Sequence, residues 1–460
     1  LHSMHTLEQL RSGALAGTRR LDLSCGLTSL PPEVFGLADT LEVLNLSDNR
    51  LTSLPHDLPR LHRLKVVFCS GNPFTHLPEV LGDCPALQMV GFKGCQLTHV
   101  PGAALPPSLR WLTLTDNAID QLPPELGQRP ALQKLMLAGN RLSALPDSLA
   151  GAQRLELIRL AANRLEHLPG WLTELPALAW LALSGNPLGW PQHAPSGHPA
   201  QTDHLAEALA GGLRPGVQAS AAASPAIPAV DWAQLSVGEL LGQGASGLIH
   251  RVLVADDQPL ALKLFKGDVT SDGLPEHELA ACLAAGQHPA LCTPSAVLAG
   301  HPQGLRGLLL PLIPPGHTNL AGPPSLDSCT RDVYPPGWQP DPHSLLRLAR
   351  QMASAVAHLH AQGVMHGDFY AHNILWDPAT GEALLSDFGA ATLLPRHDPA
   401  LAAALRALEV RAFGLWLQEL LAHAPASPLC TGWAAVAQAC VQPVPAQRPG
   451  MAEVAASLAT

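Results

Sequence analysis

The sequence predicts a multidomain protein of class α/β and α+β, in which a curved repeat solenoid precedes a second domain of strands and helices. Three observations predict this. A polar residue recurs at a nearly constant spacing through the first 190 residues, an Ala-, Pro- and Ser-rich stretch interrupts the pattern, and a non-repeating succession of strand-like and helix-like segments fills the rest. The chain of 460 residues also exceeds the usual size of one domain.

Composition and charge exclude several classes of protein. The net charge is −10, and an acidic balance argues against nucleic acid or an anionic membrane as the partner. No apolar run reaches the roughly 18–20 residues of a membrane span, and no signal peptide opens the chain. The nine cysteines are odd in number and form no Cys-x-x-Cys pair, which is typical of reduced thiols in a cytoplasmic protein.

The N-terminal part repeats a leucine pattern around one polar position. Between Leu41 and Asn49 it reads Leu-x-x-Leu-x-Leu-x-x-Asn, and the spacing is 23 residues except for 22 between Cys95 and Asn117. Alternating leucines give a short strand with one buried face, and the asparagine amide can bond backbone groups where the chain leaves the strand. The repeated position is held in order by Gly26, Asn49, Asn72, Cys95, Asn117, Asn140, Asn163 and Asn186.

This pattern resembles the leucine-rich repeat and covers about residues 18–190 in eight units. Each such unit buries its apolar face only against its neighbours, which gives a solenoid. We expect residues 1–17 to form a helical cap over the first repeat. Strand residues between the leucines face the concave side, and we expect Phe68, Trp111, Met136 and Trp180 to bind a protein partner there. The alternative is that some of them pack against the neighbouring domain or lie exposed.

The repeat pattern stops at Trp190, and residues 191–234 read as a linker. The composition of residues 193–199 is typical of a loop, and the pattern of residues 203–209 predicts one short helix. Residues 218–225 form a low-complexity connector. We therefore place the second domain at residues 235–460.

A glycine-rich segment opens the second domain, with Gly242, Gly244 and Gly247. The spacing alone also fits a dinucleotide-binding turn, but such a turn leads into a helix. Residues 248–254 instead read as a second strand, so the glycines lie in a hairpin whose bare backbone can close over phosphates. Lys263 follows on a third strand. A buried lysine is costly unless paired, and its natural partners are nucleotide phosphates and a helix carboxylate.

Three polar residues further along have the chemistry that phosphoryl transfer needs. Asp368 and Asn373 lie five residues apart, and Asp387 precedes Phe-Gly. Asp368 can accept a proton from an attacking hydroxyl, while Asn373 and Asp387 can hold Mg²⁺ against nucleotide phosphates, because Mg²⁺ takes carboxylate, amide and phosphate oxygens. Asp-Phe-Gly alone is a weak signal, but the paired spacing is much stronger.

Together these segments resemble a eukaryotic-type protein kinase domain, which implies a bilobal fold that uses ATP and Mg²⁺. The resemblance makes Glu278, or alternatively Glu276, the partner of Lys263. Leu310 would be the gatekeeper residue, and the backbone of Leu312 and Ile313 would face the adenine. The implied catalytic residues are Lys263, Asp368, Asn373 and Asp387, with Asn373 and Asp387 as metal ligands. The implied nucleotide-binding residues are Gly242, Gly244, Gly247, Ile249, Ala261, Lys263, Glu278, Leu310, Leu312 and Ile313.

The chain departs from this family after the catalytic motif begins. Gly367 replaces the arginine that grips a phosphate on the activation loop in related kinases. The resemblance makes Glu409 the start of the next long helix, so that only residues 390–408 separate Gly389 from it. These residues contain no Ala-Pro-Glu motif, and Thr392 is their one hydroxyl residue. The usual partner of Arg448 is thereby missing. We expect activity that does not depend on activation-loop phosphorylation.

The residues that separate serine/threonine from tyrosine kinases fit neither class, since Tyr370 and His372 occupy those positions. His-Gly-Asp is also similar to the aminoglycoside and choline phosphotransferases. The Pro-rich stretch 314–342 is either a functional insert or a plain surface loop. As a whole the chain resembles a bacterial leucine-rich-repeat kinase, which implies an ATP-dependent protein kinase of Ser/Thr or dual specificity with a protein-binding arm. The alternative is a repeat scaffold with a nucleotide-binding pseudokinase.

Overall fold

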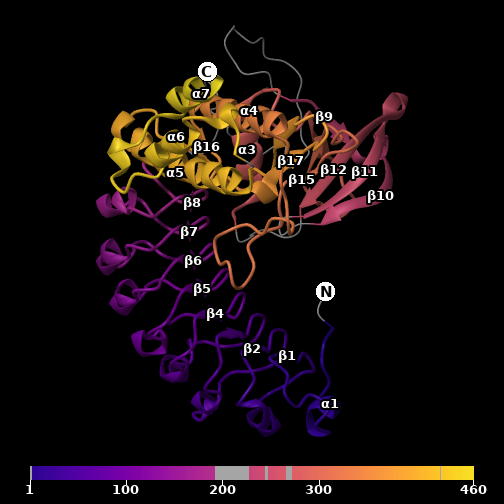
Figure 1. Ribbon diagram of the computed structural model, residues 1–460. Coiled ribbons are helices and arrows are strands. Elements are labelled where there is room, and N and C mark those ends of the chain that lie inside the picture. Colours follow the sequence, from indigo (N-terminus) through magenta and orange to yellow (C-terminus); the bar gives the residue numbers. More distant parts are fainter. Residues whose placement is uncertain (1–2, 192–226, 244–246, 266–271, 425) are drawn as a thin grey trace. The chain divides into compact units, whose positions relative to one another are not determined.

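The computed structural model describes residues 3–191, 227–243, 247–265, 272–424 and 426–460. Contacts within the chain divide it into two compact units (Figure 1). The first unit holds residues 1–178 and 186–188, and the second holds residues 179–185 and 189–460. The short helix expected at 203–209 lies outside the described residues.

The first unit is built on a parallel sheet of three-residue strands, paired in chain order. Short 3-10 helices alternate with the strands and most of them follow a proline, whose fixed φ favours such a turn. The strands are β1 (Arg20–Asp22), β2 (Val43–Asn45), β3 (Val66–Phe68), β4 (Met89–Gly91), β5 (Trp111–Thr113), β6 (Lys134–Met136) and β7 (Leu157–Arg159). The 3-10 helices are η1 (Pro32–Leu37), η2 (Leu58–Arg60), η3 (Glu79–Asp83), η4 (Gly102–Ala104), η5 (Pro124–Gln128), η6 (Asp147–Gly151) and η7 (Gly170–Glu174).

The recurring asparagines hold the turns that follow the strands. Asn49 accepts hydrogen bonds from the backbone N–H groups of Cys25 and Leu27 at 3.0 and 3.1 Å, and it donates to the carbonyls of Leu23 and Leu46 at 2.8 Å. The remaining asparagines of the series make equivalent bonds one repeat further on. The expected use of the amide is confirmed, because it pairs backbone groups that would otherwise be buried unbonded.

The segment before the first repeat lies along the edge of β1. Helix α1 (Leu7–Arg11) is short and is capped by Thr6 and Gln9. The backbone N–H of His5 donates to the Asp22 carbonyl at 2.8 Å, and the His5 ring accepts from the Asp22 N–H at 3.0 Å. These bonds cover the open edge of the sheet, which is where a solenoid needs a cap.

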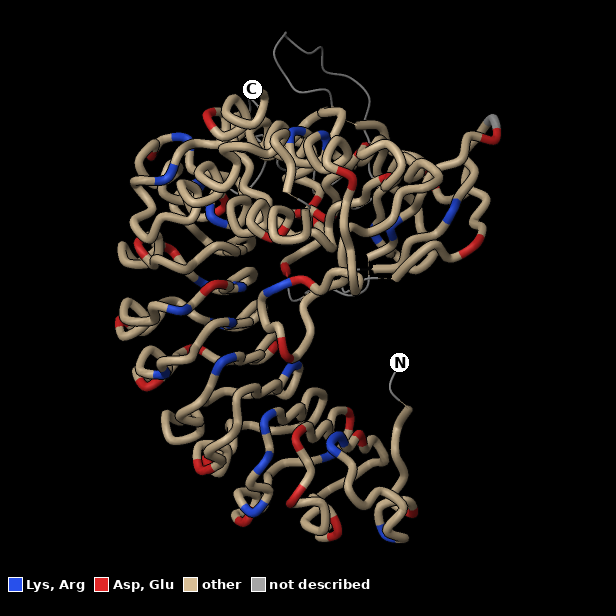
Figure 2. Tube along the Cα trace, viewed as in Figure 1, with Lys and Arg blue, Asp and Glu red and all other residues tan. Residues whose placement is uncertain are grey.

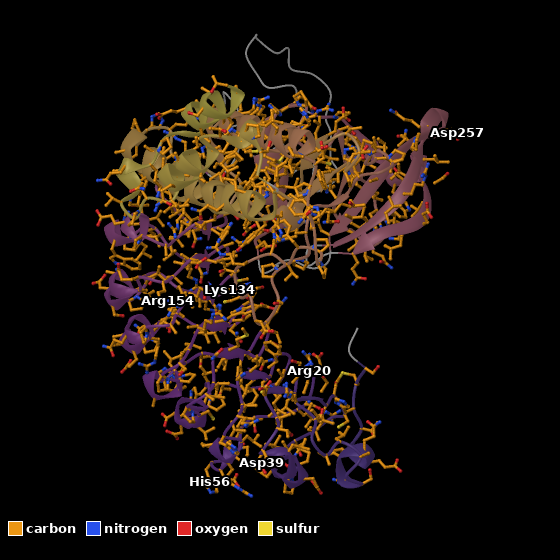
Figure 3. The ribbon with its side chains drawn as sticks, viewed as in Figure 1. Arg20, Asp39, His56, Lys134, Arg154 and Asp257 are labelled. Carbon is orange, nitrogen blue, oxygen red and sulfur yellow. The ribbon has the colours of Figure 1, made fainter. Side chains whose placement is uncertain are left out.

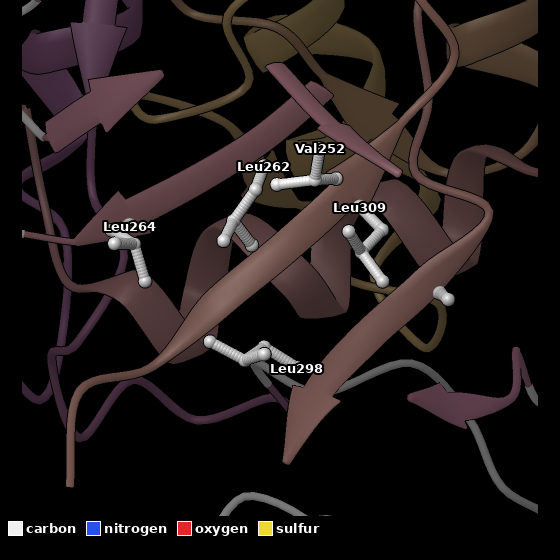
Figure 4. Close-up of a cluster of buried hydrophobic side chains, with 6 residues drawn as sticks. Val252, Leu262, Leu264, Leu298 and Leu309 are labelled. Carbon is white, nitrogen blue, oxygen red and sulfur yellow. The ribbon is translucent and has the colours of Figure 1, made fainter. Parts of the chain in front are cut away.

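The second unit contains a mixed six-stranded sheet in the order β10-β11-β12-β14-β13-β9. The predicted hairpin is present, because β10 and β11 pair antiparallel and β12 follows β11. Apolar side chains from one face of β11, β12, β13 and β14 form a buried cluster that includes Val252, Leu262 and Leu309 (Figure 4). The strands are β9 (Ala229–Asp231), β10 (Ser236–Gln243), β11 (Gly247–Val254), β12 (Gln258–Phe265), β13 (Ala296–Ala299) and β14 (Gly307–Leu310).

Helices dominate the rest of this unit. They are α3 (Pro275–Ala285), α4 (Pro342–Ala361), α5 (Pro399–His423), α6 (Trp433–Cys440) and α7 (Met451–Ala459). Short strands accompany them: β8 (Trp180–Ala182), β15 (Thr318–Asn319), β16 (Val364–Met365), β17 (Ile374–Trp376), β18 (Ala383–Leu385) and β19 (Thr392–Leu393). The placement of Glu409 at the start of a long helix is wrong. Helix α5 begins ten residues earlier, capped by the Asp398 side chain with Pro399 in its first position.

Basic and acidic residues are interspersed along the chain of the first unit (Figure 2). This is unlike the basic stripe of a nucleic-acid-binding surface. Within the described residues, no helix has both the length and the apolar character that a bilayer crossing requires.

Candidate active site

Lys263 and Glu278 form a buried ion pair beneath the glycine hairpin. Lys263 lies on β12 and Glu278 on α3, and the distance from Nζ to Oε1 is 2.6 Å. Burial alone would lower the pKa of Lys263, but attraction to the carboxylates of Glu278 and Asp387 outweighs it and raises the pKa to about 12. Lys263 is therefore charged at neutral pH. The neighbouring Glu276 instead pairs with Arg306 at 2.8 Å, so of the two candidates Glu278 is the partner of Lys263.

The two described glycines of the hairpin, Gly242 and Gly247, differ in how much room their surroundings leave for a side chain. A Cβ on Gly247 would lie 2.1 Å from the Leu264 carbonyl oxygen, so close pairing of β11 with β12 excludes a side chain there. A Cβ on Gly242 would meet no atom of the described residues within 4 Å, so these residues do not demand glycine at this position. A glycine in a strand next to open space marks a place where a ligand can approach the backbone. Gly244 lies outside the described residues.

The expected adenine-contacting residues lie on, or directly after, three neighbouring strands of the sheet, β11, β12 and β14. Ala261 on β12 pairs with Leu310 on β14, and Ile249 on β11 pairs with Lys263 on β12. Leu310 ends β14, and Leu312 and Ile313, both partly exposed, follow it directly. The fold therefore brings the residues expected to contact the adenine, and the lysine expected to bind the phosphates, onto adjoining strands.

Asp368 and Asn373 are brought together by the loop after β16. The Asn373 amide donates to the Asp368 carboxylate and to its carbonyl oxygen, each at 2.9 Å. His366 anchors the same loop, because its Nδ1 accepts from the Asp368 N–H at 3.2 Å and its Nε2 pairs with the Ser386 carbonyl at 3.0 Å. This network assigns the ring proton to Nε2. The Asp368 carboxylate is thus fixed in one orientation, as a general base needs to be.

Asp387 has the backbone conformation of a functional turn. Its φ is 60°, a left-handed value that aspartate tolerates better than most residues, and its Oδ1 accepts from the Gly389 N–H at 3.1 Å. Among the described residues, no hydrogen bond is directed at Asp387 Oδ2 or Asn373 Oδ1. One carboxylate oxygen and one amide oxygen are a donor set that Mg²⁺ accepts. The residues therefore fit the implied metal.

Glu409 anchors the loop that carries Asp368. It is 1 % exposed and accepts from His360 Nε2 and from the backbone N–H groups of His366 and Gly367, at 2.8 to 3.0 Å. Burial would raise the pKa of this carboxyl, but the hydrogen bond and charge of His360 and the Gly367 N–H outweigh it and lower the pKa. Glu409 thus lies inside α5 and holds the loop from there.

The insert at 314–342 contacts the catalytic loop, which sequence reasoning did not find. The Asp332 carboxylate accepts from the His372 N–H and pairs with His372 Nδ1, both at 2.8 Å, and the Asn319 amide donates to the His372 carbonyl at 2.7 Å. Burial lowers the pKa of His372, but its bond with Asp332 and the charges of Asp368 and Asp387 outweigh this and raise it. Asp332 and His372 are 40 positions apart in the sequence, so no local sequence pattern indicates that they pair.

Arg448 has a different type of partner from the one its family position implies. Its guanidinium donates to the carbonyls of Gln442 and Ala407, both at 2.8 Å. Burial, together with repulsion from Arg411, lowers the pKa of Arg448 to about 10. The residue therefore binds the backbone of α5 in a chain that lacks the Ala-Pro-Glu glutamate.

The expected partner-binding residues of the repeats differ in exposure. Phe68, Trp111 and Met136 are partly exposed, although the ammonium of Lys134 lies 3.9 Å above the Trp111 ring (Figure 3 labels Lys134). Trp180 is only 2 % exposed and its ring is stacked on Tyr370 within the second unit. The prediction that Trp180 is offered to a partner is therefore wrong, because a neighbouring aromatic ring covers it.

Comparison with known proteins agrees with this geometry. Residues 39–98, 107–165 and 130–188 match models of leucine-rich repeats, and residues 235–406 match the protein kinase domain. A stretch of 49 residues is 43 % identical to the protein named glycogen synthase kinase 1 of Pyricularia oryzae. That match covers 11 % of this chain and only 12 % of the relative's length. The chain thus contains leucine-rich repeats followed by a protein kinase domain, a domain type that uses ATP and Mg²⁺.

Proposed function

We propose that residues 235–460 act as an ATP- and Mg²⁺-dependent protein kinase of Ser/Thr or dual specificity. The observation that supports this best is the simultaneous assembly of two parts of the site. Lys263 is paired with Glu278 at 2.6 Å, and Asp368 is held by Asn373 at 2.9 Å. A nucleotide-binding scaffold that does no chemistry would need neither a fixed carboxylate base nor its amide partner.

Each residue has a separate task in this proposal. Lys263, held by Glu278, neutralises charge on the α- and β-phosphates, and the backbone at Gly242 and Gly247 closes over them, together with Gly244. Asn373 and Asp387 hold Mg²⁺, which when bound neutralises phosphate charge and orients the transferred group. Asp368 orients the attacking hydroxyl and accepts its proton. The backbone of Leu312 and Ile313 receives the adenine, next to Leu310, Ile249 and Ala261.

The repeats serve in this proposal as a protein-binding arm. The partly exposed Phe68, Trp111 and Met136 project from the strand rows β3, β5 and β6, where large side chains suit a protein partner. We place the protein in the cytoplasm, since its nine cysteines are all free thiols in the described structure.

The proposal is tested with labelled ATP and Mg²⁺. The wild type should transfer phosphate to itself or to a generic protein substrate. Asp368→Asn should lower the rate at least about 100-fold, since general-base catalysis alone contributes that much. Asp387→Asn should also lower the rate, because it removes a proposed Mg²⁺ ligand. Asp257→Asn is the matched control. It makes the same change at the exposed tip between β11 and β12 (Figure 3) and should leave the rate unaltered. Phosphopeptide mass spectrometry then gives the residue specificity.

A pseudokinase is the second candidate, supported by the short segment of nine residues between Gly389 and α5. A scaffold of this kind would bind ATP without turnover. Titration calorimetry with ATP on the same proteins separates the two functions, because binding with no labelled product in the wild type supports the scaffold. A rate that depends on Asp368 excludes it.

A further inference from the structure

The segment Ala179–Gly185 belongs by its contacts to the second unit, although its sequence continues the repeats. The indole N–H of Trp180 donates to the carbonyl of Phe369 at 3.0 Å. Its ring stacks on Tyr370 with the centroids 4.3 Å apart and the planes 10° from parallel. Phe369 and Tyr370 directly follow Asp368, so one buried side chain fixes both the backbone and the side-chain direction of the loop next to the proposed base.

The same segment also fixes the chain that follows Gly389. The N–H of Leu183 donates to the Thr392 hydroxyl at 3.2 Å, and the indole of Trp190 donates to the Leu393 carbonyl at 2.8 Å. A Cβ on Gly367 would lie 2.9 Å from the Leu181 carbonyl oxygen and 2.5 Å from that of Ala390. Gly367 also has a φ of 79°. An arginine at this position is therefore excluded by the backbone it would meet as well as by conformation.

These contacts hold the loop that carries Asp368 and the segment that follows Gly389. A phosphate gripped by an arginine next to the catalytic aspartate would hold the loop and the following segment together through charge. Here the loop has no such arginine. The loop and the following segment are held instead by two indole N–H groups, one aromatic stack and one backbone N–H. All of these groups are supplied by the chain itself and need no modification.

We propose that Trp180 is a positioning residue for the catalytic loop, and that the segment Ala179–Gly185 together with Trp190 holds the loop in its working geometry in place of a phosphorylated activation segment. The inference rests on the proposed kinase function. It adds that the catalytic loop is held permanently by unmodified side chains of the same chain. Trp180 is not among the residues to which the proposed function assigns the nucleotide or the metal. Its loss should therefore lower kcat by misplacing Asp368, with little effect on ATP affinity, since Lys263 and the glycine hairpin lie on other elements.

The test compares Trp180→Ala and Trp180→Phe with the wild type in the full chain. Trp171→Phe is the matched control, because Trp171 lies in η7 of the first unit. Titration calorimetry with ATP counts the binding-competent sites, and kcat is expressed per such site. We expect Trp180→Ala to lower this kcat at least about 10-fold. Its ATP Kd should stay within about 2-fold of the wild-type value. Trp180→Phe should be intermediate, because phenylalanine keeps a ring for Tyr370 but loses the N–H. An unchanged kcat per binding site in both variants would overturn the inference.

Amide hydrogen exchange separates this inference from the kinase proposal. The N–H groups of residues 368–373 should exchange faster in Trp180→Phe than in the wild type, while those of β12 remain unchanged. Amide exchange can be measured without any phosphate transfer. An inactive wild type would therefore refute the proposed kinase function, while the effect of Trp180 on the loop could still be measured. Equal exchange of residues 368–373 in the wild type and in Trp180→Phe would show that Trp180 does not hold the loop. Trp180→Phe also serves if Trp180→Ala fails to fold.

Discussion

The imidazole of His372 lies 2.8 Å from the carboxylate of Asp332, which joins the insert at 314–342 to the catalytic loop. The side chain of Asp332 is fully buried and that of His372 is 21 % exposed. In a pair with so little water access, much of the interaction depends on the proton that His372 carries. The insert is therefore a support of the site, whose strength changes with pH.

We predict that this support weakens as pH rises. The folded-state pKa of His372 is raised above its ordinary value of 6.5. The stabilisation is therefore fully present below about pH 6.5, the unfolded value, and is lost as pH rises through the folded value. Asp332→Asn keeps the shape but removes the charge, and should cost about 1.5–3 kcal/mol at pH 6 and less at pH 9.

Urea denaturation of the wild type and of Asp332→Asn at both pH values measures this difference. Asp327→Asn, in the same insert, serves as the matched control. A destabilisation of equal size at pH 6 and pH 9 would show that the charge of His372 does not matter.

Breaking the Lys263–Glu278 pair should affect stability and activity differently. Lys263→Met removes the cation and leaves a buried carboxylate, which should cost about 3–5 kcal/mol of unfolding free energy. Lys263→Met combined with Glu278→Leu removes both charges and should recover most of that stability. Neither variant should transfer phosphate, because both lack Lys263, which we propose neutralises the charge of the nucleotide phosphates.

Thermal unfolding and labelled-ATP assays on these variants check the prediction. The exposed pair of Arg347 and Glu382, at 2.9 Å, provides the control, and Arg347→Met should change stability by less than about 1 kcal/mol. If the double variant were as unstable as Lys263→Met, the cost would not come from an unpaired carboxylate.

Those parts of the site that depend on local spacing could be predicted from the sequence. The period of 23 residues fixes the repeats, and the strand order around the glycines places Lys263 opposite a helix that carries Glu278. Asp368 and Asn373 meet because five residues of one loop separate them. The start of α5 could also have been read from Asp398 and Pro399, whose capping signals are local and outweigh the family spacing.

The remaining parts depend on contacts between distant segments. Trp180 has the strand position of a concave-face residue, and its burial is decided by Tyr370, 190 positions later. Asp332 lies in an irregular stretch, where no periodicity shows which side chains point inward. Only the folded chain brings such pairs together.

Glu409 should make the protein sensitive to acid. Its folded-state pKa is lowered, so its stabilisation is present above its ordinary value of about 4.5 and is lost as pH falls through the folded value. Glu409→Gln should destabilise the protein by about 1–3 kcal/mol at pH 7, because one of its two carboxylate acceptors becomes a donor facing N–H groups. The loss should shrink below pH 4. Denaturation curves at pH 7 and pH 4 measure it, with the exposed Glu382→Gln as control, and a pH-independent loss would contradict the expectation.

Thr392 should not act as a phosphorylation switch. It is 1 % exposed, and its hydroxyl already accepts the N–H of Leu183 at 3.2 Å, so an attacking kinase could not reach it in the folded protein. Thr392→Ala should leave kcat within a few-fold of the wild type, because the contacts of Trp180 and Trp190 remain, yet lower the unfolding free energy by about 1–3 kcal/mol, because the buried hydrogen bond to the Leu183 N–H is lost. Thr392→Val fills the space better and should lose less.

Phosphopeptide mass spectrometry after incubation with ATP, together with kcat for both variants, tests this expectation. Phosphate at Thr392, or a loss of activity in Thr392→Ala while folding and ATP binding are intact, would refute it. A Thr392→Glu variant makes the opposite change. Its charge would be buried next to the Leu183 N–H and the Leu393 backbone, so it should destabilise the protein without raising kcat.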